Sequence, residues 1–384
     1  FNPGNLVIQR DNAFLRPDLA ARLATAGETS FNFGRYSVDI GFIGAENINR
    51  TTRLVGGFQG EFGNGFKWET YGEYGHTRYR QILANNLIST RFRNSVDAVM
   101  VNGQAVCRIN AATVTDPACV PVNLFGVGSP SQGAIDYFTA DADFIQKIDQ
   151  RVAAASLTGD LFQFGGKPVS FATGAEYREE KTSAVTDSIS RAGGFILGNP
   201  QPLAGKYNVK EAFLELSLPL LHDMAFFQAL DIDGAVRATD YSTSGTVYTW
   251  KVGANWQIND SIRLRFTRSR DIRAPNLDDL FLSRQQLVAT VTDPLRPGTQ
   301  TQILRFRSGN PQLDPERANT LTAGIVLTPS FFPGFRASVD FYDIKIANAI
   351  AVLDTQVIIN RCAAGETLLC SLVNRNAAGI ITDV

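Results

Sequence analysis

The stretch "PVSFATGAEYREE", residues 168–180, decides the fold class because its side chains alternate in polarity with a period of two. In an extended chain Val169, Phe171 and Tyr177 point one way, and Glu176 and Arg178 point the other. The stretches "KEAFLELSLPLL", "YTWKVGANWQI", "SIRLRFT", "TLTAGIVL" and "FRASVDF" repeat the pattern. One face is nearly always apolar and the other is polar, charged or glycine, so the sequence predicts an all-β protein of antiparallel strands.

The same alternation predicts ten strands along the chain. They span about residues 50–62, 65–81, 150–164, 168–181, 207–219, 226–241, 246–258, 261–270, 317–329 and 333–346. A short amphipathic helix is expected within 11–35, and a further short strand is possible within 36–49.

The connections between these strands alternate in kind. Tight turns are expected at "GNG", "GGK", "LLHDMAFF", "IND" and "SFFPG", and between them lie connections of about 68, 25, 4, 46 and more than 35 residues. Structureless loops this long are rare in a compact soluble domain. Short periplasmic turns and long extracellular loops are typical of a transmembrane β-barrel, whose apolar side chains face lipid and whose polar ones face the lumen. Aromatic residues near the strand ends suit the interfacial girdles of such a barrel: Trp68, Trp250, Trp256, Tyr74 and Tyr248.

Composition and motifs argue against several other classes. The formal net charge is −1, so no basic surface suggests a nucleic-acid partner. The sequence carries no GxSxG, HExxH or P-loop signature, and its two histidines are far apart. We therefore expect neither an enzyme nor a bound cofactor or metal.

The four cysteines fall into two local pairs. Cys107 and Cys119 enclose "RINAATVTDPA", and Cys362 and Cys370 enclose "AAGETLL". Neither pair has CxxC spacing or a nearby histidine, which disfavours zinc. Two short disulfide-closed loops in an oxidising compartment are expected, with four buried thiols as the alternative.

The charged side chains on the polar face are the informative ones. Facing lipid, each would cost a few kcal/mol, whereas a wet lumen accepts them at little cost. Two interpretations stay open: a lumen salt-bridge network that holds something inside the barrel, or direct contact with an anionic ligand. The candidates for plug or ligand contact are Arg178, Arg237, Arg263, Arg265, Glu176, Glu211 and Glu215.

Several motifs in the same order closely resemble the barrel of TonB-dependent receptors. They are "NVKEAFLELSLPLL", "RFTRSRDIRAPNLDDLF", "GNPQLDPERANTLTAGIVLTP" and "FRASVDFYDIKIANAI". "CRINAATVTDPACVPVNLFG" and "ATGAEYREE" look like the subgroup abundant in alphaproteobacteria. The resemblance covers nearly all of residues 1–384. It implies a 22-stranded barrel of the cell outer membrane, filled by an N-terminal plug, which imports a scarce nutrient with energy from the TonB complex.

The sequence departs from that family pattern in extent. We expect 1–384 to be a partial barrel domain, with about ten of the 22 strands and without the plug, the energy-coupling box and the final strands. The parent protein would bind a siderophore–iron complex, cobalamin, haem or a carbohydrate, and its other partners would be a TonB-type coupling protein and outer-membrane lipid. The alternatives are a passive porin-like channel and a surface β-sheet ligand-binding module.

The long loops are expected to hold much of the ligand specificity, because loops on a rigid scaffold vary freely. We look first at 82–149 and 271–316, where Phe125, Tyr137 and Phe138 are candidate ligand contacts. In the second loop, Asn276 is expected to cap a helical turn, and Arg270 or Arg273 to pair with Glu316.

Overall fold

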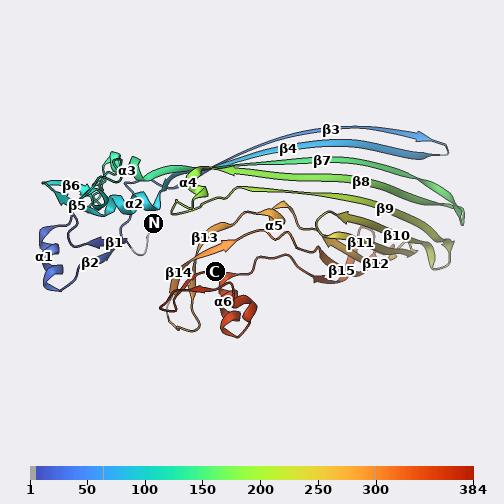
Figure 1. Ribbon diagram of the computed structural model, residues 1–384. Helices are drawn as coiled ribbons and strands as arrows, with labels where there is room; N and C mark the ends of the chain where they lie inside the picture. Colours follow the sequence, from blue (N-terminus) through green and yellow to red (C-terminus); the bar gives the residue numbers. More distant parts are fainter. Residues whose placement is uncertain (1–5, 64, 299) are drawn as a thin grey trace.

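The structure is a computed structural model that describes residues 6–63, 65–298 and 300–384. Within these residues, ten antiparallel strands form one large sheet, which confirms the all-β prediction (Figure 1). In spatial order the strands are β16 (Ala337–Ala347), β15 (Glu316–Leu327), β12 (Ile262–Arg273), β11 (Gly245–Asn259), β10 (Phe227–Tyr241), β9 (Leu203–Met224), β8 (Lys167–Thr186), β7 (Thr139–Phe164), β4 (Phe66–Leu87) and β3 (Gly44–Phe62). Each of the ten corresponds to a strand predicted from the sequence.

Several strands are longer than predicted, chiefly at the long-loop end, and β9 also continues to Met224 at the short-turn end. The strand predicted to begin at 150 begins at Thr139, so β7 is 26 residues long. The prediction started late because Asp143, Lys147 and Asp149 interrupt the apolar alternation while the backbone pairing continues. A membrane-spanning strand needs about 9–11 residues, so β7 extends well beyond a bilayer. Of the possible strand at 36–49, only residues from Gly44 onward are extended, as the start of β3.

The short turns and the long connections lie at opposite ends of the sheet (Figure 1). Short turns join β3 to β4, β7 to β8, β9 to β10, β11 to β12 and β15 to β16. Asn64 of the predicted "GNG" turn lies outside the described residues. At the other end, the long connections are 88–138, 187–202 and 274–315, whereas β10 and β11 are joined by the turn 242–244.

The chain at the long-loop end forms an N-terminal lobe, residues 6–43 and 88–138. It contains β1 (Leu6–Gln9), the predicted amphipathic helix α1 (Pro17–Thr25), β2 (Ser30–Phe33), α2 (Ser89–Val96), β5 (Ala98–Val101), β6 (Gln104–Cys107), the 3-10 helix Arg108–Asn110 and α3 (Gln132–Phe138). Its apolar core gathers Phe92, Val96, Leu124 and Phe138. The long loop therefore has a folded core of its own.

The short helix α4 (Ser188–Arg191) lies in the β8–β9 connection.

A second lobe follows β12. Its first element, α5 (Leu277–Phe281), packs against β9. Beyond it lie β13 (Gln285–Thr292), β14 (Gln300–Arg307), α6 (Thr355–Ala363), α7 (Thr367–Cys370), β17 (Asn374–Arg375) and β18 (Ile381–Asp383). The sequence prediction missed β13 and β14, although their alternating side chains carried the signal. No helix in the described part of the chain is long and apolar enough to cross a membrane.

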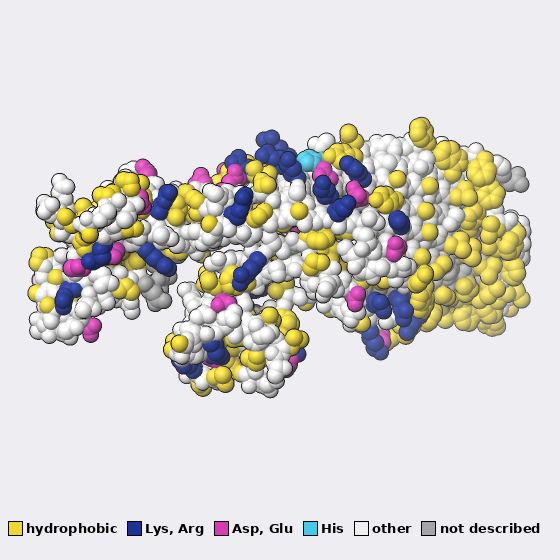
Figure 2. All heavy atoms as spheres, in the orientation of Figure 1, with side chains coloured by type: hydrophobic (Ala, Val, Ile, Leu, Met, Phe, Trp, Pro, Cys, Tyr) yellow, Lys and Arg dark blue, Asp and Glu magenta, His cyan; other side chains and the backbone are white. Residues whose placement is uncertain are grey.

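Exposed apolar side chains gather over the short-turn end of the sheet (Figure 2). Phe58 is 76 % exposed and Phe226 is 75 % exposed, and Phe62 and Phe162 are also exposed. A contiguous apolar surface of this kind marks contact with lipid or another partner. We call this surface the apolar band, and the face that carries it the outward face.

Candidate functional site

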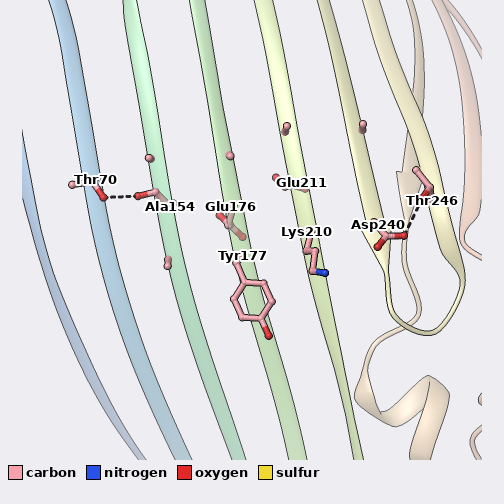
Figure 3. Close-up of a pocket in the computed structure, with 13 residues that line it drawn as sticks. Thr70, Ala154, Glu176, Tyr177, Lys210, Glu211, Asp240 and Thr246 are labelled. Carbon is pink, nitrogen blue, oxygen red and sulfur yellow. Dashed lines mark hydrogen bonds between the residues drawn. The ribbon is translucent and has the colours of Figure 1, made fainter.

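The inward face, opposite the apolar band, carries a cluster of acidic, basic and phenolic side chains. We call it the inward cluster: Glu176, Arg178, Glu180, Tyr207, Glu211 and Arg237. Its position follows from the sheet register, which places Glu176 of β8 directly opposite Glu211 of β9 (Figure 3). Two like charges opposite each other on neighbouring strands destabilise a sheet unless a counter-charge is near.

Two arginines supply that counter-charge. The Arg178 Nη1 donates to Glu176 Oε1 at 2.9 Å, and the Arg237 Nη1 donates to Glu211 Oε1 at 3.0 Å. The Arg237 guanidinium also lies 5.2 Å from the centre of the Phe213 ring, which keeps it against the sheet. Each of the two facing glutamates thus has an arginine partner.

Glu180 and Tyr207 extend the cluster toward the loops, and the sequence analysis named neither. The Tyr207 hydroxyl donates to Glu180 Oε2 at 2.7 Å, and the Arg178 Nε lies 3.5 Å from Glu180 Oε1. Tyr207 is buried at 8 % exposure, beside Leu277 and Leu280 of α5. The signal for both was the two-residue period, since Glu180 follows Arg178 on the inward face and Tyr207 precedes Glu211 by four residues.

A polar hollow of about 550 Å³ lies beside the inward cluster. Its lining includes Glu176, Arg178, Glu211, Glu215, Arg237, Tyr241, Lys251 and Asp271. With Arg270, four basic and four acidic side chains line it, so the hollow offers hydrogen bonds of both kinds without a strong net field of one sign. Such a lining suits contact with a polar surface better than capture of a small anion.

The remaining inward candidates divide into paired and unpaired residues. Arg265 pairs with Asp340 on β16, a residue that the sequence analysis did not name. Arg263 and Glu215 form no ion pair with any residue that the structure describes. Asp233, also on the inward face, pairs with Lys251, whose Nζ lies 3.2 Å from Asp233 Oδ2.

The start of the β12–β15 connection has the geometry expected from the sequence. The Arg273 Nη2 donates to Glu316 Oε1 at 3.0 Å. The two residues lie opposite each other at the loop-side end of the β12–β15 pair. The Asn276 side chain accepts from the Asp279 backbone N–H at 2.8 Å, and the Asp279 side chain accepts from the Asn276 N–H. This capping box fixes the first turn of α5, confirming the predicted cap.

The loop aromatics do not lie where a ligand could reach all of them. Tyr137 is 7 % exposed and Phe138 is fully buried, because α3 turns both into the core of the N-terminal lobe. Phe125 is half-buried against Phe33, with ring centres 5.4 Å apart. The interpretation of Tyr137 and Phe138 as candidate ligand contacts is therefore corrected: both are core residues of the lobe.

Tyr137 also makes a polar contact inside the lobe. Its hydroxyl donates to Asp116 Oδ2 at 2.6 Å. Burial, together with the Asp116 carboxylate, raises the pKa of Tyr137 to about 12. A neutral, hydrogen-bonded phenol is thus built into the lobe.

The cysteines are joined in the two local pairs that the sequence favours. Cys107 and Cys119 close a loop in the N-terminal lobe, with Cα atoms 6.3 Å apart. Cys362 and Cys370 close a loop between α6 and α7, with Cα atoms 4.7 Å apart. Both disulfides lie at the long-loop end, away from the apolar band.

Comparison with known families agrees with this geometry. A family model described as "TonB dependent receptor-like, beta-barrel" matches residues 3–380. The chain belongs to this family. No curated protein is significantly similar to the chain. Its sheet has the apolar outward face and the polar inward face that the sequence analysis expected.

Solved structures of receptors and importers are also similar to the chain. The ferric enterobactin receptor PfeA of Pseudomonas aeruginosa is 14 % identical, with a TM-score of 0.46, over 78 % of this chain and 35 % of that one. The siderophore receptor PirA from Acinetobacter baumannii is 14 % identical, with a TM-score of 0.44, over 78 % and 34 %. The RagAB peptide importer is 12 % identical, with a TM-score of 0.45, over 79 % and 30 %. The chain spans about a third of the length of these proteins.

Proposed function

We propose that this chain forms part of the barrel wall of an outer-membrane receptor that binds a scarce nutrient and imports it. The observation that carries the proposal is the match of the receptor-barrel family over residues 3–380. The apolar band on one face of the ten-stranded sheet and the inward cluster on the other support it. The cargo would be a siderophore–iron complex, cobalamin, haem or a carbohydrate, and the TonB complex would supply the energy. No enzymatic activity is expected.

In the proposed receptor, residues 1–384 are one part of the barrel domain, and the plug and the remaining strands belong to other sequence. The inward cluster would then contact the plug. Its three glutamates, Glu176, Glu180 and Glu211, outnumber Arg178 and Arg237, so the cluster does not favour an anionic cargo. Arg263 forms no ion pair with any described residue, whereas Arg265 pairs with Asp340. Arg263 is therefore a better candidate for direct ligand contact than Arg265.

The test compares uptake by the full-length protein with iron chelates, cobalamin, haem and oligosaccharides as substrates. A receptor of this kind should import one of them above the background of cells that lack it, and the import should stop when the proton gradient is dissipated. Uptake that continues without the gradient would support the passive porin-like channel instead. The sequence upstream of Phe1 gives a second readout: a plug domain and a coupling box there favour the receptor, and direct continuation from a signal peptide into strands contradicts it.

The ligand role of the arginines has its own test. Alanine substitution of Arg263 and Arg265 in the full-length protein should weaken uptake if they contact the cargo. Unchanged uptake would leave Arg265 with its structural partner Asp340 only and would remove Arg263 from the ligand candidates.

A further inference from the structure

Five basic side chains form a cluster on the outward face, between the apolar band and the loops. We call it the outer basic cluster: Arg50, Arg78, Lys147, Lys181 and Lys206, all of them exposed. The register places Arg50 of β3 opposite Arg78 of β4, and Arg78 opposite Lys147 of β7. It also places Lys181 of β8 opposite Lys206 of β9. Like charges therefore face one another across three of the four strand boundaries between β3 and β9.

The two-residue period shows that these side chains share a face with the apolar band. Arg78 lies four residues after Tyr74, which is 40 % exposed, and ten residues after Trp68, another exposed aromatic residue of the outward face. Lys181 lies four residues after Tyr177, which is 42 % exposed. At about 3.4 Å per residue, the lysine lies about 14 Å beyond the tyrosine along the strand. The cluster thus begins where the apolar surface ends.

The carboxylates near the cluster have other partners. Asp149 of β7 lies opposite Lys181 in the register without forming an ion pair with it, and it accepts hydrogen bonds from His76 Nδ1 at 2.8 Å and from the Tyr74 hydroxyl at 3.0 Å. Asp143 pairs with Arg80 at 2.9 Å. Within the residues that the structure describes, none of the five basic side chains forms an ion pair with a carboxylate.

This arrangement is unfavourable for the isolated sheet. Like charges directly opposite each other on neighbouring strands destabilise their pairing. Arg50, Arg78 and Lys147 face one another in this way, and so do Lys181 and Lys206. In the inward cluster, by contrast, each of the two facing glutamates has its own arginine. An anion outside the chain would relieve the repulsion in the outer basic cluster.

A shallow hollow of about 580 Å³ lies on the same face, between the cluster and the short turns (Figure 3). Tyr177 and Lys210 lie at its loop-side limit, with Asp240 and Thr246 on the neighbouring hairpin. Its outward-facing floor is made of small apolar side chains: Ala153, Ala155, Ala175, Ala212 and Ala238. An apolar hollow below a positive cluster matches a molecule with a hydrocarbon chain and an anionic head.

We propose that the outer basic cluster binds the phosphate groups of anionic membrane lipids, with a hydrocarbon chain of the lipid over the alanine hollow. The proposal rests on the membrane location in the proposed function. Free phosphate has the same head-group chemistry, but it would make no use of the hollow. The cluster would set the depth and the lipid surroundings of the barrel at the level where the strands leave the bilayer.

The test measures which lipid the purified full-length protein retains. The protein is stripped of lipid in detergent and equilibrated with mixed micelles that contain equal amounts of phosphatidylglycerol and phosphatidylcholine with the same acyl chains. It is then purified again, and the bound lipids are counted by native mass spectrometry. Each basic residue near a membrane surface strengthens the attraction to anionic lipid about fivefold. The variant with Lys181→Gln and Lys206→Gln should therefore lose about 25-fold of the enrichment in phosphatidylglycerol that the unaltered protein shows.

The matched control removes the same charge elsewhere. Arg22→Gln with Arg93→Gln changes two exposed arginines of the N-terminal lobe and should leave the enrichment unchanged. Equal enrichment in the Lys181/Lys206 variant and the control, with unchanged circular dichroism spectra, would overturn the proposal. Displacement of phosphatidylglycerol by millimolar inorganic phosphate would also overturn it, in favour of a free-anion site. Cell fractionation tests the proposed function separately, since a protein found outside the membrane fraction contradicts the receptor whatever lipid it binds.

Discussion

Arg265 on β12 pairs with Asp340 on β16 across the whole width of β15. The Arg265 Nε donates to Asp340 Oδ1 at 2.8 Å, and the residue of β15 that lies between them in register is Gly324. A Cβ at Gly324 would lie 2.0 Å from Asp340 Oδ1 and 2.9 Å from Arg265 Nε. The glycine therefore leaves the space that the ion pair occupies, and the three residues act as a unit.

Replacing Gly324 by alanine should break this unit. The added methyl group cannot share the space with the carboxylate, so the Asp340 side chain must move away from Arg265. Overpacking of this kind costs about 1–3 kcal/mol. We expect a lower free energy of unfolding for Gly324→Ala in urea titrations of the full-length protein in detergent.

Gly56→Ala is the matched control for that substitution. Gly56 also lies in a long strand of the sheet, but a Cβ there would meet no heavy atom within 4 Å. Its free energy of unfolding should stay close to that of the unaltered protein. If both alanine variants lose the same stability, the cause is the backbone preference of glycine and not the space required by the Arg265–Asp340 pair.

Arg237 should matter chiefly because it neutralises Glu211. Without it, Glu211 faces Glu176 across the β8–β9 pair with one counter-charge fewer. Arg237→Gln should destabilise the sheet by up to about 1 kcal/mol, since the arginine is partly exposed. Adding Glu211→Gln should restore most of that loss in the same urea titration. A double variant that is less stable than Arg237→Gln would contradict the role as counter-charge and point to packing against Phe213.

The fold could be predicted from the sequence further than the site could. Alternation along single strands was enough to locate all ten strands of the sheet, because each has one apolar and one polar face. It could not supply the pairing register, and so Asp340 was missed as the partner of Arg265. The long loops were harder to predict because their folded cores depend on contacts between distant residues, such as Phe92 with Phe138. For that reason Tyr137 and Phe138 were interpreted as candidate ligand contacts, although they are core residues.

Tyr137 should make the N-terminal lobe sensitive to high pH. The pKa of its hydroxyl is raised to about 12, above the ordinary value of 10.0, so the folded lobe holds this proton more tightly than the unfolded chain does. The resulting stabilisation is complete below about pH 10 and is lost as the pH rises through 12. In an absorbance titration at the phenolate band, Tyr137→Phe should lack one phenol that ionises near pH 12 in the unaltered protein. A titration curve that loses an ordinary phenol instead would show that Tyr137 is accessible to solvent.

The Cys107–Cys119 disulfide should hold the N-terminal lobe together independently of the rest of the sheet. The bond closes a loop with a sequence separation of 12 residues, and closing a loop of this size restricts the unfolded chain by about 3 kcal/mol. Cys107 is buried and pairs with Ala98 of β5, and Cys119 packs against the lobe core, so loosening this loop exposes the core. We expect the Cys107→Ser, Cys119→Ser variant of the full-length protein to be cut within 88–138 by a protease at concentrations that leave the unaltered protein intact. The Cys362→Ser, Cys370→Ser variant removes a disulfide of similar span from the other lobe and should keep 88–138 resistant. Equal sensitivity of 88–138 in both variants would mean that the two lobes lose their structure together, and that the N-terminal disulfide has no local role.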